Sequence, residues 1–385
     1  MTISVDDLRV VAFGGGTGMA ALLAGLKNHT RNITAVVTVS DNGGSSGMLR
    51  HDYDMVAPGD LRNCLIALAD VDPLMAKVFQ YRFEEGDLKG HCFGNLFITV
   101  LTRVVGDFEG SIRVLNRLLQ VKGRVIPAAG AKVSLVAHHP DGSKSTGEVQ
   151  ITRSKKRIDR IELRPAPVLM SDEIRDAVRE ADLFLFGPGS LFTSVIPNLL
   201  LGGLPQQMKK NGSPRVYIGN IMTQPGETDG FRLSDHIRAM QSHVGTDFPD
   251  CVIAQSGDLP EDILAKYRAE NAVPVAEDLE GHQEFRGIRI ISRNFFRSGK
   301  VARHDPELLA EAINAEFLLP RARQAAIQRD GVTAAGAARV GTRDTAGTTG
   351  ATTVTSTVTS TGASTGKPKA RRASTLEDPK HIHGS

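Results

Sequence analysis

The sequence predicts an α/β fold, in which a Rossmann-like, mostly parallel sheet has helices on both faces and a small antiparallel β insertion. Residues 10–13 form a short apolar run that ends in glycines, as a buried first strand does. An Ala- and Leu-rich segment at 19–26 and a β-branched run at 33–39 follow it. This order of strand, helix and strand predicts a parallel sheet with a right-handed crossover.

The same alternation of strands and helices resumes after a segment of different character. Apolar and polar residues alternate around a Pro-Asp-Gly turn at 132–163 (the insertion spans about 125–165), which predicts antiparallel strands, one of them including residues 148–151. We interpret the basic run at 153–157 as a solvated hairpin end rather than a binding patch. Further helices are expected at 59–68, 95–105, 111–119, 171–181 (with Ser171 as N-cap) and 307–318, and further strands at 182–186, 215–218, 252–254 and 287–291.

The charge of the chain is concentrated near its end. The 385 residues include 46 Lys and Arg and 43 Asp and Glu, of which six basic and three acidic residues lie at 341–385, leaving 40 of each in residues 1–340. A neutral body argues against a nucleic-acid partner, which requires a concentrated basic face. No apolar stretch of about 18 residues is present, so no membrane span is expected.

Three cysteines without a C-x-x-C pair support neither a disulfide framework nor a zinc site. The first residues include two acids where a signal peptide has positive charge, so a cytoplasmic protein is expected.

The segment at 331–385 is predicted to be a disordered, basic tail. Of the 26 residues at 341–366, 22 are Thr, Ser, Gly or Ala, which cannot bury enough apolar area to offset the entropy of ordering. Eleven threonines at 342–365, flanked by basic residues, suggest phosphorylation by a kinase, which would alter a contact between the tail and a partner. An inert solubilising extension is the alternative.

The first candidate binding motif is the glycine loop after the first strand. It consists of Gly14, Gly15, Gly16, Thr17 and Gly18. Glycines permit a sharp turn and close approach of a ligand, and the amide groups and dipole at a helix start favour an anion such as a diphosphate. The spacing of Gly16, Gly18 and Ala21 also matches the weak form of the dinucleotide fingerprint. A tight turn without a ligand is the alternative.

Two polar motifs follow in the first half of the chain. Asp41 and Asn42 come directly after the second strand, where ligand crevices of such sheets lie, although Asp-Asn-Gly-Gly is also ordinary turn chemistry. Asp60, Arg62 and Asn63 stand at a helix start, where Asp60 is a candidate helix cap and Arg62 a candidate phosphate contact. Asp41 and Asp60 together could hold a divalent ion such as magnesium.

A second glycine-containing loop lies in the second half of the chain, again between a strand and a helix. It is a second candidate anion site. A hydrolase is disfavoured because the G-x-S-x-G pattern is absent around the loop serine. The candidate ligand-binding residues of this half are Gly187, Pro188, Gly189, Ser190, Thr193, Asn198, Asn220 at the end of a strand, and Arg303 before the last helix.

Together these motifs resemble the gluconeogenesis factor family, the YvcK-like proteins, which are related to the CofD-like 2-phospho-L-lactate transferases. The matching strings include FGGGTG, TVSDNGGSSGMLR, APGDLRNCLIALA, GHCFGNLFI, FGPGSLFTSVIPNLL, GNIMTQPGET and RHD. The resemblance implies a Rossmann-like domain at 1–330 that binds a UDP-sugar, in the first place UDP-N-acetylglucosamine. It also implies a cytoplasmic regulator of cell shape and cell-wall synthesis during gluconeogenic growth, with a cell-wall-synthesis protein as a candidate partner of the tail.

The resemblance assigns roles by motif. The loops at Gly14–Gly18 and 187–193, with Asn198 and Asn220, would form the pocket, and Arg303 would contact the diphosphate. No catalytic residue, required cofactor or metal is then expected, and a homo-oligomer is compatible with the sequence.

The transferase relatives provide the alternative, an enzyme that moves a phospholactyl group onto a deazaflavin with magnesium held by aspartates. Asp41 and Asp60 would be its catalytic and metal-binding residues. The neighbours of both aspartates depart from the transferase pattern, which favours a binding factor without turnover.

Overall fold

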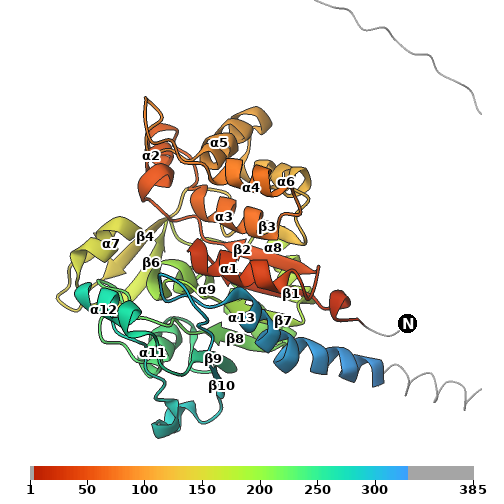
Figure 1. Ribbon diagram of the computed structural model, residues 1–385, viewed down its shortest axis with the longest axis vertical. Coiled ribbons are helices and arrows are strands. Elements are labelled where there is room, and N and C mark those ends of the chain that lie inside the picture. The colour runs from red at the N-terminus through yellow and green to blue at the C-terminus, as the bar shows by residue number, and fades with distance from the viewer. Residues whose placement is uncertain (1–3, 328–385) are drawn as a thin grey trace, which may run out of the picture. The chain divides into compact units, whose positions relative to one another are not determined.

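The computed structural model describes residues 4–327, all of which fall within one compact unit of the chain. The tail predicted at 331–385, with its threonine-rich segment, lies outside the described residues. The predicted fold class is confirmed: a parallel seven-stranded sheet has helices on both faces and is joined by a three-stranded antiparallel sheet (Figure 1). No helix among residues 4–327 is long and apolar enough to cross a membrane.

The main sheet has the strand order β10-β9-β8-β7-β1-β2-β3, with every neighbouring pair parallel. The chain therefore builds outward in one direction from β1 to β3, returns to the other side of β1 with β7, and continues to β10. The strands are β1 (Val10–Gly14), β2 (Ile33–Val37), β3 (Arg124–Pro127), β7 (Leu183–Phe186), β8 (Arg215–Ile218), β9 (Cys251–Gln255) and β10 (Arg289–Arg293).

The central strands are apolar because both faces of the sheet are covered. All five residues of β1 are buried, and the four before Gly14 alternate between two cores. Val10 and Ala12 pack under α1 (Gly16–Leu26), α3 (Gly59–Leu68) and α13 (Pro306–Ile313). On the other face, Phe13 stacks on Phe186 of β7 with ring centroids 4.9 Å apart. A run without polar residues thus identifies a strand that is covered on both sides.

The remaining helices form the outer layers. Three of them, α4, α5 and α6, lie on the same side of the molecule as α3 (Figure 1). The helix predicted at 171–181 is confirmed as α8, and the Oγ of its N-cap Ser171 accepts a hydrogen bond from Ile174 N–H at 3.3 Å. The other helices are α2 (Gly44–Asp52), α4 (Pro73–Gln80), α5 (Phe93–Val105), α6 (Phe108–Leu118), α7 (Glu148–Ser154), α8 (Asp172–Glu180), α9 (Ile196–Leu199), α10 (Leu204–Asn211), α11 (Leu233–Val244) and α12 (Glu261–Ala269).

The antiparallel insertion is smaller than the sequence predicted and contains a helix. Its strands β4 (Ser134–His138), β5 (Lys144–Thr146) and β6 (Arg160–Arg164) pair in the order β5-β4-β6. The expected range of about 125–165 began too early, because β3 belongs to the edge of the main sheet. The strand expected over residues 148–151 was wrong, since these residues open α7. The basic run at 153–157 accordingly spans the end of α7 and the approach to β6 rather than a hairpin end.

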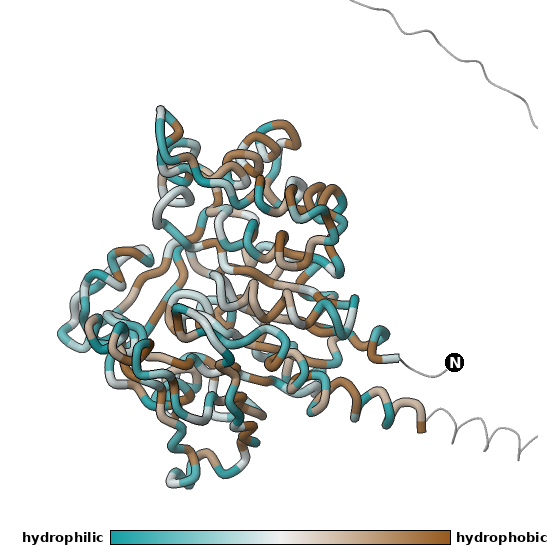
Figure 2. Tube along the Cα trace, viewed as in Figure 1, coloured by the Kyte–Doolittle hydropathy of each residue, from teal (hydrophilic) through white to brown (hydrophobic). Residues whose placement is uncertain are grey.

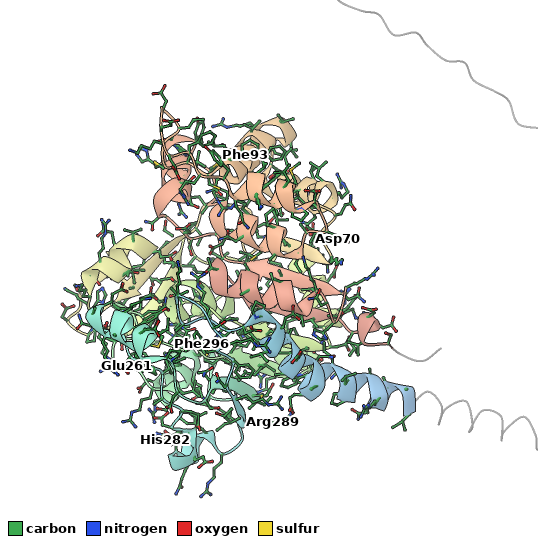
Figure 3. All side chains as sticks on the ribbon, in the orientation of Figure 1. Asp70, Phe93, Glu261, His282, Arg289 and Phe296 are labelled. Carbon is green, nitrogen blue, oxygen red and sulfur yellow. The ribbon has the colours of Figure 1, made fainter. Side chains whose placement is uncertain are left out.

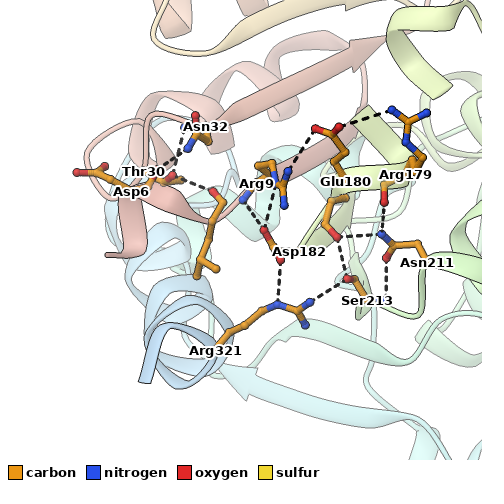
Figure 4. Close-up of polar contacts among 12 residues, drawn as sticks. Asp6, Arg9, Thr30, Asn32, Arg179, Glu180, Asp182, Asn211, Ser213 and Arg321 are labelled. Carbon is orange, nitrogen blue, oxygen red and sulfur yellow. Dashed lines mark hydrogen bonds and ion pairs between the residues drawn. The ribbon is translucent and has the colours of Figure 1, made fainter. Parts of the chain in front are cut away.

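The amino-terminal end of the main sheet is closed by paired charges (Figure 4). The Asp182 carboxylate accepts hydrogen bonds from Arg9 N–H at 3.0 Å and from Arg321 Nε at 3.3 Å. Arg9 also pairs with Glu180 at 3.2 Å, and Arg321 Nη2 donates to Ser213 Oγ at 3.2 Å. These contacts join β1, β7 and the C-terminal helical segment at the edge that faces away from the carboxyl ends of the strands.

Candidate functional site

The sheet changes its direction of growth between β1 and β7, and the two glycine loops that the sequence singled out follow these two strands. In open α/β sheets, ligands bind at this switch point, outside the carboxyl ends of the strands. The loops touch each other: a Cβ added at Gly18 would lie 2.7 Å from the carbonyl oxygen of Pro188, and one added at Gly189 would lie 3.4 Å from the carbonyl oxygen of Gly15. Glycine is therefore required at Gly18, because any side chain there would push the loops apart.

An acid from another helix faces the loop at the start of α1. Gly16 has a φ of +69°, and a Cβ added there would meet no atom within 4 Å, so this residue borders open space. A Cβ added at the preceding Gly15 would lie 2.5 Å from Asp60 Oδ2 and 2.3 Å from Thr38 Oγ1, so the Asp60 carboxylate lies directly beside the glycine loop. Asp60 was a candidate cap of its own helix, but α3 has Pro58 as N-cap and no side-chain cap. Asp60 instead faces the first glycine loop.

The loop after β2 connects the main sheet to the insertion. Asp41 Oδ1 accepts Gly43 N–H at 2.8 Å, which is the turn chemistry expected of this string. Asn42 Oδ1 accepts Val149 N–H at 3.0 Å and so ties the first turn of α7 to the loop. The insertion is thereby brought over the carboxyl end of the sheet.

Four carboxylates converge at this end of the sheet: Asp41, Asp60, Glu148 and Glu227. Burial and then the charge of Asp41 raise the pKa of Asp60 to about 6, against weaker opposing effects of the Gly16 N–H, Arg62 and Thr38. Burial, followed by the charges of Asp41, Asp60 and Glu227, raises the pKa of Glu148 to about 8. Burial raises the pKa of Glu227 as well. We call these four residues the acidic cluster.

Hydroxyl groups link the acidic cluster to the second glycine loop. Ser190 Oγ donates to Glu227, and Thr193 Oγ1 lies 2.7 Å from Ser190 Oγ and 3.5 Å from Glu148 Oε1. Thr152 Oγ1 of α7 donates to the other oxygen of Glu227 at 3.2 Å. Glu227 is only 6% exposed, and a buried carboxylate needs hydrogen-bond partners. Ser190 and Thr152 provide one for each of its two oxygens.

Two arginines lie near the acidic cluster without forming an ion pair with it among residues 4–327. Arg62 Nη1 donates to Asn95 Oδ1 at 2.6 Å and Nη2 to Asn63 Oδ1 at 2.8 Å, while Nε has no partner in this part of the chain. Arg50 donates to Val39 O at 3.2 Å and is buried. Burial lowers the pKa of both guanidinium groups. The guanidinium of Arg62, the candidate phosphate contact, is thus oriented by two side-chain amides.

The other candidate residues differ in how deeply they are buried. Asn198 is fully buried, and its Nδ2 donates to Gly14 O at 3.3 Å and to Ser194 O at 2.8 Å, so it supports both loops from beneath. Asn220 follows β8 and donates to Gln224 Oε1 at 3.3 Å. Arg303 is exposed, and the neighbouring His304 contacts the backbone of Gly219 at the end of β8. Thr17 is exposed in the first turn of α1, and Gly187 N–H donates to Phe13 O at 2.9 Å.

A cleft of about 600 Å³ lies beside the glycine loops rather than over them. It shares Glu227 with the acidic cluster, and its other lining residues include Lys155, Arg157, Asp229 and Phe231. Lys155 and Arg157 of the basic run that the sequence interpretation set aside therefore line this cleft. We locate the candidate site at the glycine loops, with this cleft as its lateral extension.

Sequence analysis missed two residues of the acidic cluster. Glu148 was hidden because its segment was assigned to a strand. Glu227 lies within the GNIMTQPGET string but was not singled out, and no spacing in the sequence connects it to Ser190. The burial of each was the missing signal, and burial depends on the fold.

Comparisons with known proteins agree with this architecture. The family model described as 2-phospho-L-lactate transferase CofD matches residues 10–296. The chain is 42% identical over 307 residues to the gluconeogenesis factor of Bacillus subtilis, covering 79% of this chain and 96% of that one. It is 43% identical over 306 residues to the gluconeogenesis factor of Halalkalibacterium halodurans, covering 79% and 95%.

The fold is also similar to that of a solved protein. A crystal structure of a Bacillus halodurans protein matches with a TM-score of 0.77 and 42% identity, covering 80% of this chain and 99% of that chain. The resemblance inferred from the motifs is thus confirmed, and the chain belongs to the CofD family, with gluconeogenesis factors as its close relatives.

Proposed function

As a member of this family, the chain has, we propose, the function of a UDP-sugar-binding regulatory factor. UDP-N-acetylglucosamine is the first ligand we expect, and the role is the control of cell shape and cell-wall synthesis during gluconeogenic growth, without turnover. The observation that carries the proposal is the contact of the two glycine loops at the switch point between β1 and β7. Nucleotides bind at this place in open α/β sheets.

The charges around the loops favour a ligand that brings a cation with it. A diphosphate beside Gly16 would lie near Asp60, whose carboxylate faces the glycine loop at Gly15. A divalent ion between phosphate and carboxylate would remove this repulsion. Residues 4–327 contain no group of three or more His, Cys, Asp or Glu side chains arranged to hold a metal. Asp41 and Asp60 fit an ion that is held mainly by phosphate oxygens and water.

Arg303 and Asn220 would complete recognition of the ligand. Arg303 is exposed near the end of β8, which supports a role as a diphosphate contact from outside the loops. Asn220 presents an amide at the same strand end, and amides recognise base or sugar edges through paired donors and acceptors. Both residues belong to the strings on which the resemblance to the gluconeogenesis factors rests.

Calorimetric titration tests the proposal. UDP-N-acetylglucosamine should bind with a Kd in the micromolar range, about −8 kcal/mol, and more tightly with magnesium than with a chelator. UDP-glucose, UDP and GDP serve as comparisons, and Arg303→Ala should weaken UDP-sugar binding about tenfold. Absence of heat at millimolar UDP-sugar, with a sample that unfolds cooperatively, would falsify the proposal.

The second candidate function is a magnesium-dependent phospholactyl transferase. The family description and the crowding of Asp41 and Asp60 motivate it. When bound, magnesium would supply charge neutralisation, and Asp41 and Asp60 would hold it. Formation of a phospholactyl deazaflavin from the activated donor, lost in Asp41→Asn, would establish this function in place of the first. An inactive chain that still binds UDP-sugar excludes it.

A further inference from the structure

The cleft beside the glycine loops is bordered by the end of α7, the start of α11 and the end of α12. Figure 1 shows these three helices on the same side of the molecule, and Figure 2 shows hydrophilic residues along α7 and α12. Figure 3 labels Glu261 at the start of α12, and the cleft lies at the other end of this helix. Its volume of about 600 Å³ is typical of small-molecule sites. Six of its lining residues are Lys155, Arg157, Asp229, Phe231, Glu270 and Asn271.

One side chain separates the cleft from the second glycine loop. Glu227 lines the cleft, and its carboxylate accepts hydrogen bonds from Ser190 of this loop and from Thr152 of α7. A Cβ added at Gly226 would overlap the carbonyl oxygen of Thr152, so α7 packs tightly against this part of the cleft. A ligand that is anchored at the glycine loops therefore has the cleft directly beside it.

An aromatic ring with a fixed position borders the cleft. The Phe231 ring makes edge contacts with the rings of Phe192 and His236, with centroids 6.1 and 5.9 Å away. Both of these neighbours are buried, whereas Phe231 is partly exposed and lines the cleft. A ring that is already held in place by packing loses little conformational freedom when a ligand binds against it.

Several polar side chains of the cleft are free to contact a ligand. Asp235 pairs with Arg238 at 3.3 Å, and Asp229 accepts Gly226 N–H at 2.8 Å. Four other lining side chains are exposed and form no ion pair or hydrogen bond with residues 4–327: Lys155, Arg157, Glu270 and Asn271. This set combines two cationic donors, an anionic acceptor and an amide that both donates and accepts.

The backbone at the two borders of the cleft has an uncommon conformation. Four non-glycine residues among 4–327 have a positive φ, and two of them, Lys155 at +50° and Asn271 at +61°, line this cleft. Asparagine adopts this left-handed conformation readily, but lysine does so rarely. Such conformations persist where the surrounding structure enforces them, and they are concentrated at ligand-binding sites.

We propose that this cleft is the subsite for the sugar ring of the nucleotide sugar. Phe231 would contact the face of the ring, and Arg157 and Asn271 would be specificity-determining contacts to its substituents. The inference rests on the proposed function, because it takes the diphosphate to lie at the glycine loops. A sugar ring has C–H groups on its face and hydroxyl groups on its rim, and each hydroxyl both donates and accepts. One aromatic face surrounded by free donors and acceptors matches this chemistry.

A nucleobase matches the cleft less well than a sugar does. A base presents its hydrogen-bonding groups along its edges, whereas the free polar groups of the cleft come from two different helix ends, those of α7 and α12. A ligand group with a strong net charge is also disfavoured. Lys155 and Arg157 would attract an anion, but Glu270 and Asp229 in the same lining would repel it.

Calorimetric titration of the full chain with UDP-N-acetylglucosamine and, separately, with UDP tests the proposal. Asn271→Gly removes the amide and retains a residue that adopts a positive φ without strain. Its affinity for the UDP-sugar should fall about fivefold, as expected for one lost hydrogen bond, and its affinity for UDP should not change. The matched control is Gln120→Gly, because Gln120 is another exposed amide with a positive φ (+46°) and lies outside the cleft. This control should bind both ligands like the wild type.

A second pair of variants tests the other border of the cleft. Arg157→Ala should also weaken UDP-sugar binding about fivefold and leave UDP binding unchanged. Arg153→Ala is its control, because Arg153 is an exposed arginine in the last turn of α7 and does not line the cleft. All four side chains are exposed, so each variant should unfold as cooperatively as the wild type.

The two ligands separate a failure of this inference from a failure of the proposed function. If the wild type binds neither UDP-N-acetylglucosamine nor UDP, the proposed function is wrong, and the inference fails with it. If both ligands bind but the cleft variants match their controls, the inference alone is overturned. Cleft variants that weaken UDP as much as the UDP-sugar would place the base in the cleft, which also overturns the inference.

Discussion

The carboxylates at the two ends of the main sheet have opposite electrostatic surroundings. At the amino end, Asp182 lies between Arg9 and Arg321 (Figure 4). At the carboxyl end, the four residues of the acidic cluster have no ion pair within residues 4–327, and the pKa values of Asp60, Glu148 and Glu227 are raised by burial. The nearby Arg50 and Arg62 donate to carbonyl and amide oxygens instead.

This difference separates a structural edge from a functional one. Paired charges at the amino end hold β1, β7 and the C-terminal segment together. Crowded, unpaired carboxylates cost stability and are found where a ligand or a proton is to be received. Close backbone approaches at glycine occur at both ends, at Gly18 beside Pro188 and at Gly123 beside Ile33, so it is the surroundings of the carboxylates that distinguish the two ends.

The largest expected effect follows from closing that approach. The substitution Gly18→Ala places a Cβ 2.7 Å from the carbonyl oxygen of Pro188, so the two glycine loops must separate. We expect UDP-sugar affinity to fall at least 30-fold, or about 2 kcal/mol, measured by calorimetry.

The matched control is Gly287→Ala, where an added Cβ would meet no atom within 4 Å. Its affinity should equal that of the wild type. If Gly18→Ala binds the UDP-sugar as tightly as this control, the contact of the loops does not shape the binding site. The carboxyl end of the sheet is then not the functional end.

The next largest effect concerns the pH dependence of stability. The pKa of Glu148 is about 8 in the folded chain, above its ordinary value of 4.5. The folded chain therefore binds more protons than the unfolded chain between these values, and stability falls as pH rises from about 4.5 to 8. Glu148→Gln removes this loss. Urea unfolding without ligand should show the variant about 2 kcal/mol more stable than wild type above pH 8 and nearly equal to it near pH 5, after allowance for solvent screening.

An acid in a paired environment provides the control of opposite sign. Hydrogen bonds from Arg164 lower the pKa of Glu162, so its contribution to stability is present at neutral pH and is lost as pH falls through the folded pKa. Glu162→Gln should therefore destabilise the chain slightly at pH 8 and have no effect in acid. If Glu148→Gln changes the free energy of unfolding equally at pH 5 and above pH 8, the pKa of Glu148 is not raised by its burial beside the other three acids of the cluster.

Much of the fold was predictable because its signals are local. The apolar run of β1, the glycine turn and the N-cap Ser171 specify their elements within a few residues. The strand β3 was missed because only four residues, Arg124–Pro127, form this edge strand. The helix α7 was taken for a strand because its seven residues lie between two true strands, where alternation dominates the pattern.

The candidate site was predictable only where a motif lies at a strand end. The loops after β1, β2, β7 and β8 were located in this way, because parallel strands bring their carboxyl ends to one edge. The acidic cluster was not, since Glu148 and Glu227 reach the edge from the insertion and from a long loop. The position of Asp60 was also hidden, because an acid that faces a loop of another element leaves no spacing in its own helix.

The smallest expected effect tests the amino end. In Asp182→Asn the amide oxygen can still accept Arg9 N–H, but the charge that faces Arg9 and Arg321 is lost. Because these groups are partly exposed, we expect a loss of about 1 kcal/mol in the free energy of unfolding. Urea unfolding at low and at about 1 M salt measures it, and the difference from wild type should shrink at high salt, where charges are screened within about 3 Å. UDP-sugar affinity should not change, because Asp182 lies at the opposite end of β7 from the glycine loops. A loss of UDP-sugar affinity in Asp182→Asn without a loss of stability would contradict the assignment of a structural role to the amino end and a binding role to the carboxyl end.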